Sequence, residues 1–239
     1  MRWIGVGLLA GLLGWTASSV GQDEEKANPV GKLKSIPQSF RAYVVVDDRF
    51  DVKDVRNRTG KFHCFVCEHG LVPAVAVFVR TVPREVDGQP LIKLFGQLND
   101  AAIKFKAERL GVYAIFLNLD QRYEDDLKRE DKVAAVAGIG KELKLPQVPF
   151  AIAAATIAQG DEKVPSPEVA AFQIGPDDEV TVIFYNRFEI LNRWVFTNDK
   201  PMTDADVTAV RAAIDKVLTP PARVSRFKKA DPPKKESPK

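Results

Sequence analysis

The sequence predicts an α/β domain built on a mixed sheet with a parallel core. Short apolar or β-branched runs alternate with longer stretches of helical periodicity, and a strand-strand-helix unit closes the order. Strands that alternate with helices are joined by right-handed crossovers, which makes the central strands parallel. With 45% hydrophobic residues, the chain can bury one core, so we expect a single domain over residues 40–218 with helices flanking the sheet.

The first predicted strand is short and covers residues 43–47. A polar, turn-rich stretch follows over residues 51–60. Residues 74–80 are apolar nearly throughout, which is typical of a strand covered on both faces. Residues 90–110 carry apolar side chains at helical spacing, and Gly111 is the expected stop.

A second buried strand is predicted over residues 112–117 and a second helix over 124–145. The third strand, residues 148–153, begins at Val148-Pro149, which is permitted because proline is tolerated at the first residue of a strand. After a loop over residues 159–167, residues 179–185 and 189–196 are expected to pair as a hairpin.

A final helix is predicted to begin after Thr203. Asp206, three residues later, completes a capping pattern with this threonine. The side chains expected to face the core are Val207, Val210, Ile214 and Val217.

The first 21 residues have the layout of a secretory signal peptide. A basic start is followed by an apolar run over residues 3–15 and by small residues over 16–21. The apolar run is too short to serve as a stable membrane anchor. We therefore expect cleavage near residue 21, a secreted or periplasmic mature protein, and no transmembrane segment after cleavage.

The two ends of the mature chain are polar. Residues 22–39 form a lead-in, and residues 219–239 form a basic, proline-rich tail that we expect to be disordered. Residues 221–239 hold seven Lys or Arg against two acids, so they contribute +5 to a chain whose net charge is +3. The tail could make weak contact with an anionic surface, and the sequence predicts no specific nucleic-acid binding.

All cysteines and histidines of the chain lie within seven residues. The segment reads His63-Cys64-Phe65-Val66-Cys67-Glu68-His69. A Cys-x-x-Cys pair can alternate between dithiol and disulfide, and in an exported protein the disulfide is the expected resting state. This segment is therefore the candidate site.

The predicted element order, the exported Cys-x-x-Cys pair and the Val148-Pro149 junction together resemble the thioredoxin-like superfamily. In that family a cis-proline opens a strand beside the active site. The resemblance implies that Cys64 and Cys67 are catalytic and that Pro149 shapes the substrate groove.

The position of the cysteines departs from the family pattern. The pair precedes the strand over residues 74–80, whereas the family's pair follows it, and the matching position, Arg80-Thr81-Val82-Pro83, has no cysteine. A strand of seven residues spans about 23 Å, so we expect the pair near the opposite end of the sheet from Pro149.

The resemblance implies a thiol-disulfide oxidoreductase that acts on protein or small-molecule disulfides. The more exposed sulfur would attack a substrate disulfide and the other would resolve the mixed disulfide. By sequence order, Cys64 is the nucleophile and Cys67 the resolving thiol. His63 or His69 could supply positive charge to the thiolate, whereas Glu68 would raise the thiol pKa.

Metal binding is an alternative use of the same segment. If the chain is extended there, neighbouring side chains alternate between faces, which places His63, Cys67 and His69 on one side and Cys64 on the other. Such a set could hold copper or zinc. Covalent haem needs a histidine directly after the second cysteine, a position that Glu68 occupies, so we do not expect covalent haem. For the redox interpretation we expect no cofactor.

A third interpretation is a redox-inactive binding or structural module on the same fold. The disulfide would then clip a hairpin and stabilise the protein by about 2 kcal/mol, because the loop that it closes is so short. Both histidines would be ordinary surface residues.

Overall fold

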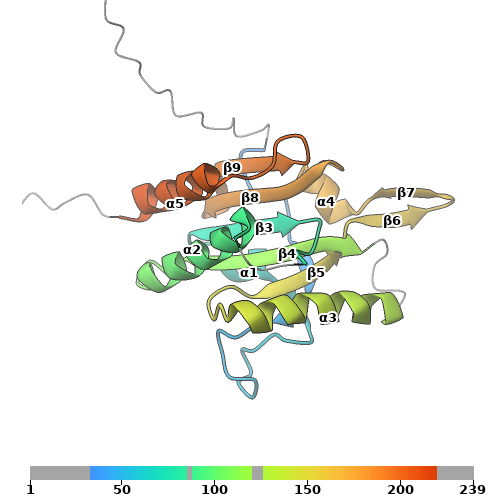
Figure 1. Ribbon diagram of the computed structural model, residues 1–239, viewed down its shortest axis with the longest axis horizontal. Helices are drawn as coiled ribbons and strands as arrows, with labels where there is room; N and C mark the ends of the chain where they lie inside the picture. The colour runs from blue at the N-terminus through green and yellow to red at the C-terminus, as the bar shows by residue number, and fades with distance from the viewer. Residues whose placement is uncertain (1–32, 85–87, 120–125, 220–239) are drawn as a thin grey trace, which may run out of the picture.

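The computed structural model describes residues 33–84, 88–119 and 126–219 (Figure 1). The expected signal peptide and all but the first residue of the expected tail lie outside these ranges. The elements in chain order are β1 Arg41–Val46, β2 Phe62–Cys64, α1 Phe65–His69, β3 Ala74–Val79, α2 Pro90–Lys104, β4 Gly111–Leu119, α3 Asp126–Leu143, β5 Phe150–Ala154, β6 Thr156–Gln159, β7 Glu162–Pro165, α4 Pro167–Ala171, β8 Asp178–Asn186, β9 Glu189–Thr197 and α5 Asp204–Leu218.

Seven strands form one mixed sheet in the order β2-β1-β5-β4-β3-β8-β9. The three central strands β3, β4 and β5 are parallel, whereas β8 and β9 run antiparallel on one side and β1 and β2 on the other. The predicted fold class, a mixed sheet with a parallel core and flanking helices, is confirmed.

The strand β3 is covered on both faces. All six of its side chains are at most 1% exposed, as its unbroken apolar sequence predicts. Alternate side chains enter two separate cores. Helices α2, α3 and α5 contribute to one core, while α1, α4 and the segment before β1 contribute to the other.

The last helix forms largely as predicted. Thr203 caps α5, and its side chain and that of Asp206 make both hydrogen bonds of a capping box. Three of the four expected inward side chains are buried, but Val217 is 45% exposed. Leu218 is buried in its place, because it lies four residues after Ile214 on the same helical face.

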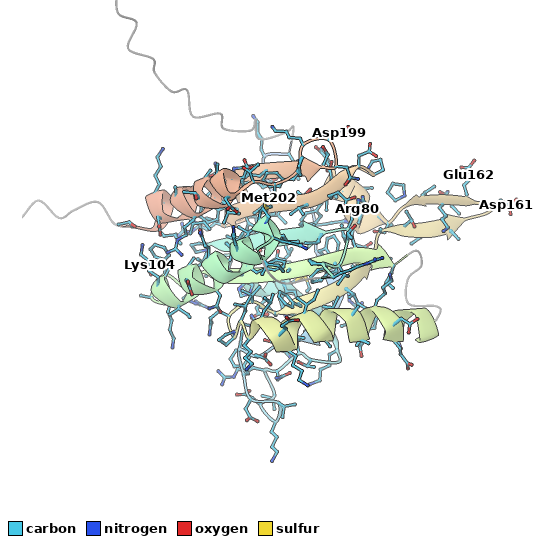
Figure 2. All side chains as sticks on the ribbon, viewed as in Figure 1. Arg80, Lys104, Asp161, Glu162, Asp199 and Met202 are labelled. Atoms are coloured by element: carbon cyan, nitrogen blue, oxygen red, sulfur yellow. A yellow bond between two sulfur atoms is a disulfide. The ribbon has the colours of Figure 1, made fainter. Side chains whose placement is uncertain are left out.

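Two regions differ from the sequence-based expectation. Helix α2 ends at Lys104 and not at residue 110. Residues 105–109 form turns instead, and Arg109 at their end has a φ of +62°. The stretch expected to be a loop, residues 159–167, instead contains the whole of β7, which pairs with β6 just before it, and leads directly into α4. The β6–β7 hairpin projects away from the main sheet, with Asp161 and Glu162 near its tip (Figure 2).

The segment before β1 is packed against the domain. Ser35 bridges Glu189, and the backbone N–H of Ile36 donates to the carbonyl of Phe188 at 2.8 Å. Both Ile36 and Phe40 are buried, so the domain begins before residue 40. Among the described residues, no helix is long and apolar enough to cross a membrane.

A buried hydroxyl pair links the strands on either side of β3. Tyr113 on β4 and Tyr185 on β8 are both 0% exposed, and their hydroxyl oxygens are 3.1 Å apart. We expect Tyr113→Phe to lower the free energy of unfolding by about 1–2 kcal/mol, because the hydroxyl of Tyr185 would lose this partner.

Urea unfolding with the disulfide intact measures this cost. The double variant Tyr113→Phe/Tyr185→Phe should lose less than the sum of the two single variants, because it leaves neither hydroxyl unpaired. Strictly additive losses would contradict a coupled pair.

Candidate functional site

The cysteine pair lies where β2 meets α1. Cys64 is the last residue of β2, opposite Arg41 on β1, and it caps the helix that follows. Its sulfur accepts the backbone N–H of Cys67 at 3.1 Å. The extended segment considered for metal binding is not formed, because α1 begins directly after Cys64. Phe65 and Val66 are both buried in one core, which a strand could not achieve for adjacent side chains.

Cys64 and Cys67 form a disulfide with their Cα atoms 5.2 Å apart. The two cysteines differ in accessibility. Cys67 is exposed, whereas Cys64 is partly buried and packs against the core that contains Phe65. An incoming molecule can therefore reach the bond from the side of Cys67.

A groove with apolar walls lies beside the exposed sulfur. It is lined by Cys67 together with Ile36, Pro37, Gln38, Ser39, Val66 and Phe188. The ring of Phe188, in the turn between β8 and β9, also packs on Gly70, where a Cβ atom would overlap it. The turn and the segment before β1 therefore form the walls of the approach to the disulfide.

The structure does not bring Pro149 into this site. As predicted, the cysteines precede β3. Pro149 is buried at the start of β5, where its carbonyl accepts the N–H of Ala114. The cis-proline expectation is wrong, because the described residues contain no cis peptide bond. The strand that follows Pro149 is also not a neighbour of β3. Strand β5 pairs with β4 and β1, whereas the strand that pairs antiparallel with β3 is β8.

Glu68 is the centre of a charge network beside the disulfide. Its carboxylate lies 2.6 Å from Nε2 of His63 and accepts from Arg49 Nη1 at 2.8 Å. Burial alone would raise the pKa of Glu68, but the hydrogen bond from His63 and the charges of His69 and Arg49 outweigh it and lower the pKa to about 2. Glu68 is therefore ionised at neutral pH.

Arg49 connects this network to the end of β1. Its Nε donates to the fully buried carboxylate of Asp47 at 2.7 Å, and its guanidinium lies over the rings of Phe50 and Phe65 at 5.6 and 5.5 Å. Sequence reasoning assigned no role to Asp47 or Arg49. The sequence around them gives no sign of a contact with Glu68, because that contact joins positions nineteen residues apart.

His69 is held as a neutral ring. It stacks on Tyr113 with the ring centroids 6.1 Å apart, and a Cβ atom on Gly111 would lie only 2.5 Å from it. Burial is the main cause that lowers the pKa of His69, to about 4. At neutral pH this histidine therefore supplies no positive charge to a thiolate.

The predicted metal ligands do not converge in this oxidised form. The sulfur of Cys67 is bonded to Cys64, His63 contacts Glu68, and His69 packs on Tyr113. Within residues 33–84, 88–119 and 126–219, no group of three or more potential ligands is placed to hold a metal ion. Copper or zinc binding by His63, Cys67 and His69 stays a prediction.

The neutral state of His69 predicts a pH-dependent stability. Its pKa falls from 6.5 to about 4 on folding, so the unfolded chain binds more protons between these values. The free energy of unfolding should be highest above pH 6.5 and should fall toward pH 4, by up to about 3 kcal/mol. Urea unfolding of the wild type and of His69→Gln at pH 7.5, 6.5 and 5.0 tests this. Equal pH dependence in both proteins would contradict it.

Comparison with known proteins gives no assignment by sequence, because no protein family model and no curated protein matches the chain. Solved structures do show similarity. One is assigned as the thiol:disulfide interchange protein DsbE of Chlorobium tepidum, at 15% identity over 77% of this chain and 96% of that chain, with a TM-score of 0.47. Another is AhpC of Mycobacterium tuberculosis, at 10% identity over 77% and 96%, with a TM-score of 0.47.

A third similar structure is the thioredoxin domain of a thiol-disulfide oxidoreductase from Bacteroides vulgatus, at 13% identity over 78% of this chain and 97% of that chain, with a TM-score of 0.42. With TM-scores below 0.5, these likenesses carry no inference about the chemistry of this chain. The order and pairing of its own elements, from β3 through α2 and β4 to the β8–β9–α5 unit, make the fold thioredoxin-like, with the cysteine pair before β3.

Proposed function

We propose that this protein is a thiol-disulfide oxidoreductase that exchanges electrons through Cys64 and Cys67. The observation that carries the proposal is the unequal exposure of the two sulfurs. Cys67 is exposed beside a groove, whereas Cys64 is held at the start of α1 with its sulfur bonded to the N–H of Cys67. A disulfide with one reachable sulfur and one retained sulfur is suited to exchange.

In the exchange step, a substrate thiol first loses its proton to solvent. The resulting thiolate attacks the sulfur of Cys67. The bond between Cys67 and Cys64 breaks, and Cys64 leaves as a thiolate that accepts the N–H of Cys67 and is later protonated by solvent. A second substrate thiolate then attacks the substrate sulfur and releases Cys67. The substrate pair is oxidised to a disulfide and the protein pair is reduced. The reverse sequence reduces a substrate disulfide, and the proposed nucleophile is then Cys67 rather than Cys64.

The surrounding charges favour the oxidised pair. Glu68 is ionised and adjacent to Cys67, Arg49 is neutralised by Asp47 and Glu68, and His69 is uncharged. No free positive charge of these groups stabilises a thiolate at Cys67, and a destabilised thiolate makes the reduced pair a better electron donor. We therefore infer that electrons flow from the reduced protein to disulfides in its substrates.

A structural disulfide is the second candidate function. Its supporting observation is that Cys64 packs against a core, so the bond also fastens the end of β2 to α1. Closing a loop this short stabilises the folded chain by about 2 kcal/mol in the chain-entropy model. The protein would then be a binding module on a thioredoxin-like scaffold.

Export is part of the proposal. Residues 1–21 have the layout of a signal peptide, and an oxidising periplasm or extracellular space would keep the disulfide formed. Cell fractionation with sequencing of the mature amino terminus tests this. A cytosolic protein that retains residue 1 would contradict it.

Single-cysteine variants separate the roles of the two sulfurs. Cys64→Ser should leave an exposed thiol at position 67 that reacts rapidly with iodoacetamide, whereas Cys67→Ser should leave a thiol that reacts at least about tenfold more slowly. Wild-type protein should reduce insulin with dithiothreitol as the electron source, and neither variant should do so.

Redox titration against glutathione buffers provides the matching equilibrium measurement. A wild-type protein without turnover and with a potential far below about −300 mV would identify a structural bond. Faster alkylation of Cys67→Ser than of Cys64→Ser would contradict the assigned roles.

The charge of Glu68 makes a further prediction. Glu68→Gln should lower the pKa of the neighbouring thiol and raise the alkylation rate of the reduced protein at pH 7 by about threefold or more, because it removes a negative charge from the residue next to Cys67. Glu142→Gln, on the exposed side of α3, is the control and should leave the rate unchanged. The pH profile of iodoacetamide alkylation measures both. An unchanged profile in Glu68→Gln would rule out this electrostatic effect.

A further inference from the structure

A second hollow is lined by Glu68 and His69 of α1, whereas the groove beside Cys67 is lined by Val66 and Cys67. It is bounded by the loop after β1, by α1, by the turn that follows α2 and by the start of β4, and its volume is about 430 Å³. This volume falls within the range of small-molecule sites, about 300–1,000 Å³. The charged and amide side chains that line it are Arg49, Arg56, Glu68, Lys106, Arg109 and Gln147.

Four of these side chains are cationic, and two of them are held in place by other groups. Arg49 is bound by Asp47 and by Glu68, and among the residues that the structure describes Glu68 is the only carboxylate that lines the hollow. Arg56 pairs with Asp54 at 2.6 Å and lies 4.3 Å from the ring centroid of Phe50. Both arginines are therefore already paired with carboxylates of the protein.

The other two cations, Lys106 and Arg109, are free. Within the described part of the chain, neither makes an ion pair or a side-chain hydrogen bond, and both are exposed at the hollow. The carbonyl end of a helix attracts cations, but Lys104 already occupies that position at the end of α2 and pairs with Asp215 at 2.9 Å (Figure 2). Lys106 and Arg109 are therefore not needed to complete the helix.

The backbone at Arg109 adds to this argument. Its φ of +62° lies in the left-handed region, which glycine or asparagine adopts at lower cost than arginine. The arginine at this turn is one of the residues that line the hollow, as is Gln147. A guanidinium binds carboxylate or phosphate oxygens through two parallel hydrogen bonds, and an ammonium adds a point charge.

We propose that this hollow binds a small oxyanion with at least two negative charges, of the phosphate or polycarboxylate class, through Lys106 and Arg109. Glu68 does not oppose this binding strongly, because Arg49 and His63 already bind its carboxylate. The site uses neither sulfur, so it is independent of the redox proposal.

Isothermal titration calorimetry with pyrophosphate and with citrate, at an ionic strength of about 0.15 M and pH 7.5, tests the proposal on the full-length mature protein. The wild type should bind at least one of the two anions with a dissociation constant below about 1 mM. Lys106→Ala/Arg109→Ala should weaken that binding at least tenfold. The amide resonance of Gly111, which lines the hollow, should shift on binding in the wild type only.

The matched control is Lys141→Ala/Lys216→Ala, which removes the same charge from exposed positions outside the hollow. It should bind within about twofold of the wild type, since at this ionic strength distant charges contribute little. The relative affinities for pyrophosphate and citrate distinguish a phosphate site from a carboxylate site. The absence of saturable binding by the wild type, or an equal loss in the two double variants, would overturn the proposal.

Discussion

The burial of β3 on both of its faces is the constraint on which the rest of the structure depends. A strand whose six side chains are all excluded from water needs a layer of cover on each side of the sheet. Helices α2, α3 and α5 supply one layer. The other layer is assembled from shorter pieces, and α1 is one of them. The cysteine segment is therefore part of the core packing, and its conformation is set by the face that it covers.

This position explains the charged groups around the disulfide. When α1 packs on the sheet, Glu68 and His69 are drawn toward the end of β1, where Asp47 is fully buried. A buried carboxylate is tolerated only when it is paired and hydrogen-bonded, and Arg49 satisfies Asp47 and Glu68 together. The same arrangement leaves His69 uncharged against Tyr113. The result is a rigid polar network with little surplus positive charge near the sulfurs.

The sequence predicted the elements that are determined by residues close together in the chain. The apolar run of β3 and the capping box of α5 each act over a few residues, and both are present. Helix α1 was not predicted, because five residues are too few to show helical periodicity and the helix follows from the joint burial of Phe65 and Val66. The cis form expected at Pro149 was also wrong. That expectation rested on the resemblance alone, and the strand that follows Pro149 pairs with β1 and β4 and not with β3.

The cysteine pair was predictable as a disulfide from its spacing, whereas its environment was not. The two cysteines are three positions apart, so their bond crosses no other element of the fold. A bridge between distant strands would couple every electron transfer to the integrity of the whole domain. Here the bond closes only a single turn of chain, so the redox cycle that we propose requires no change in the pairing of the sheet or in either core.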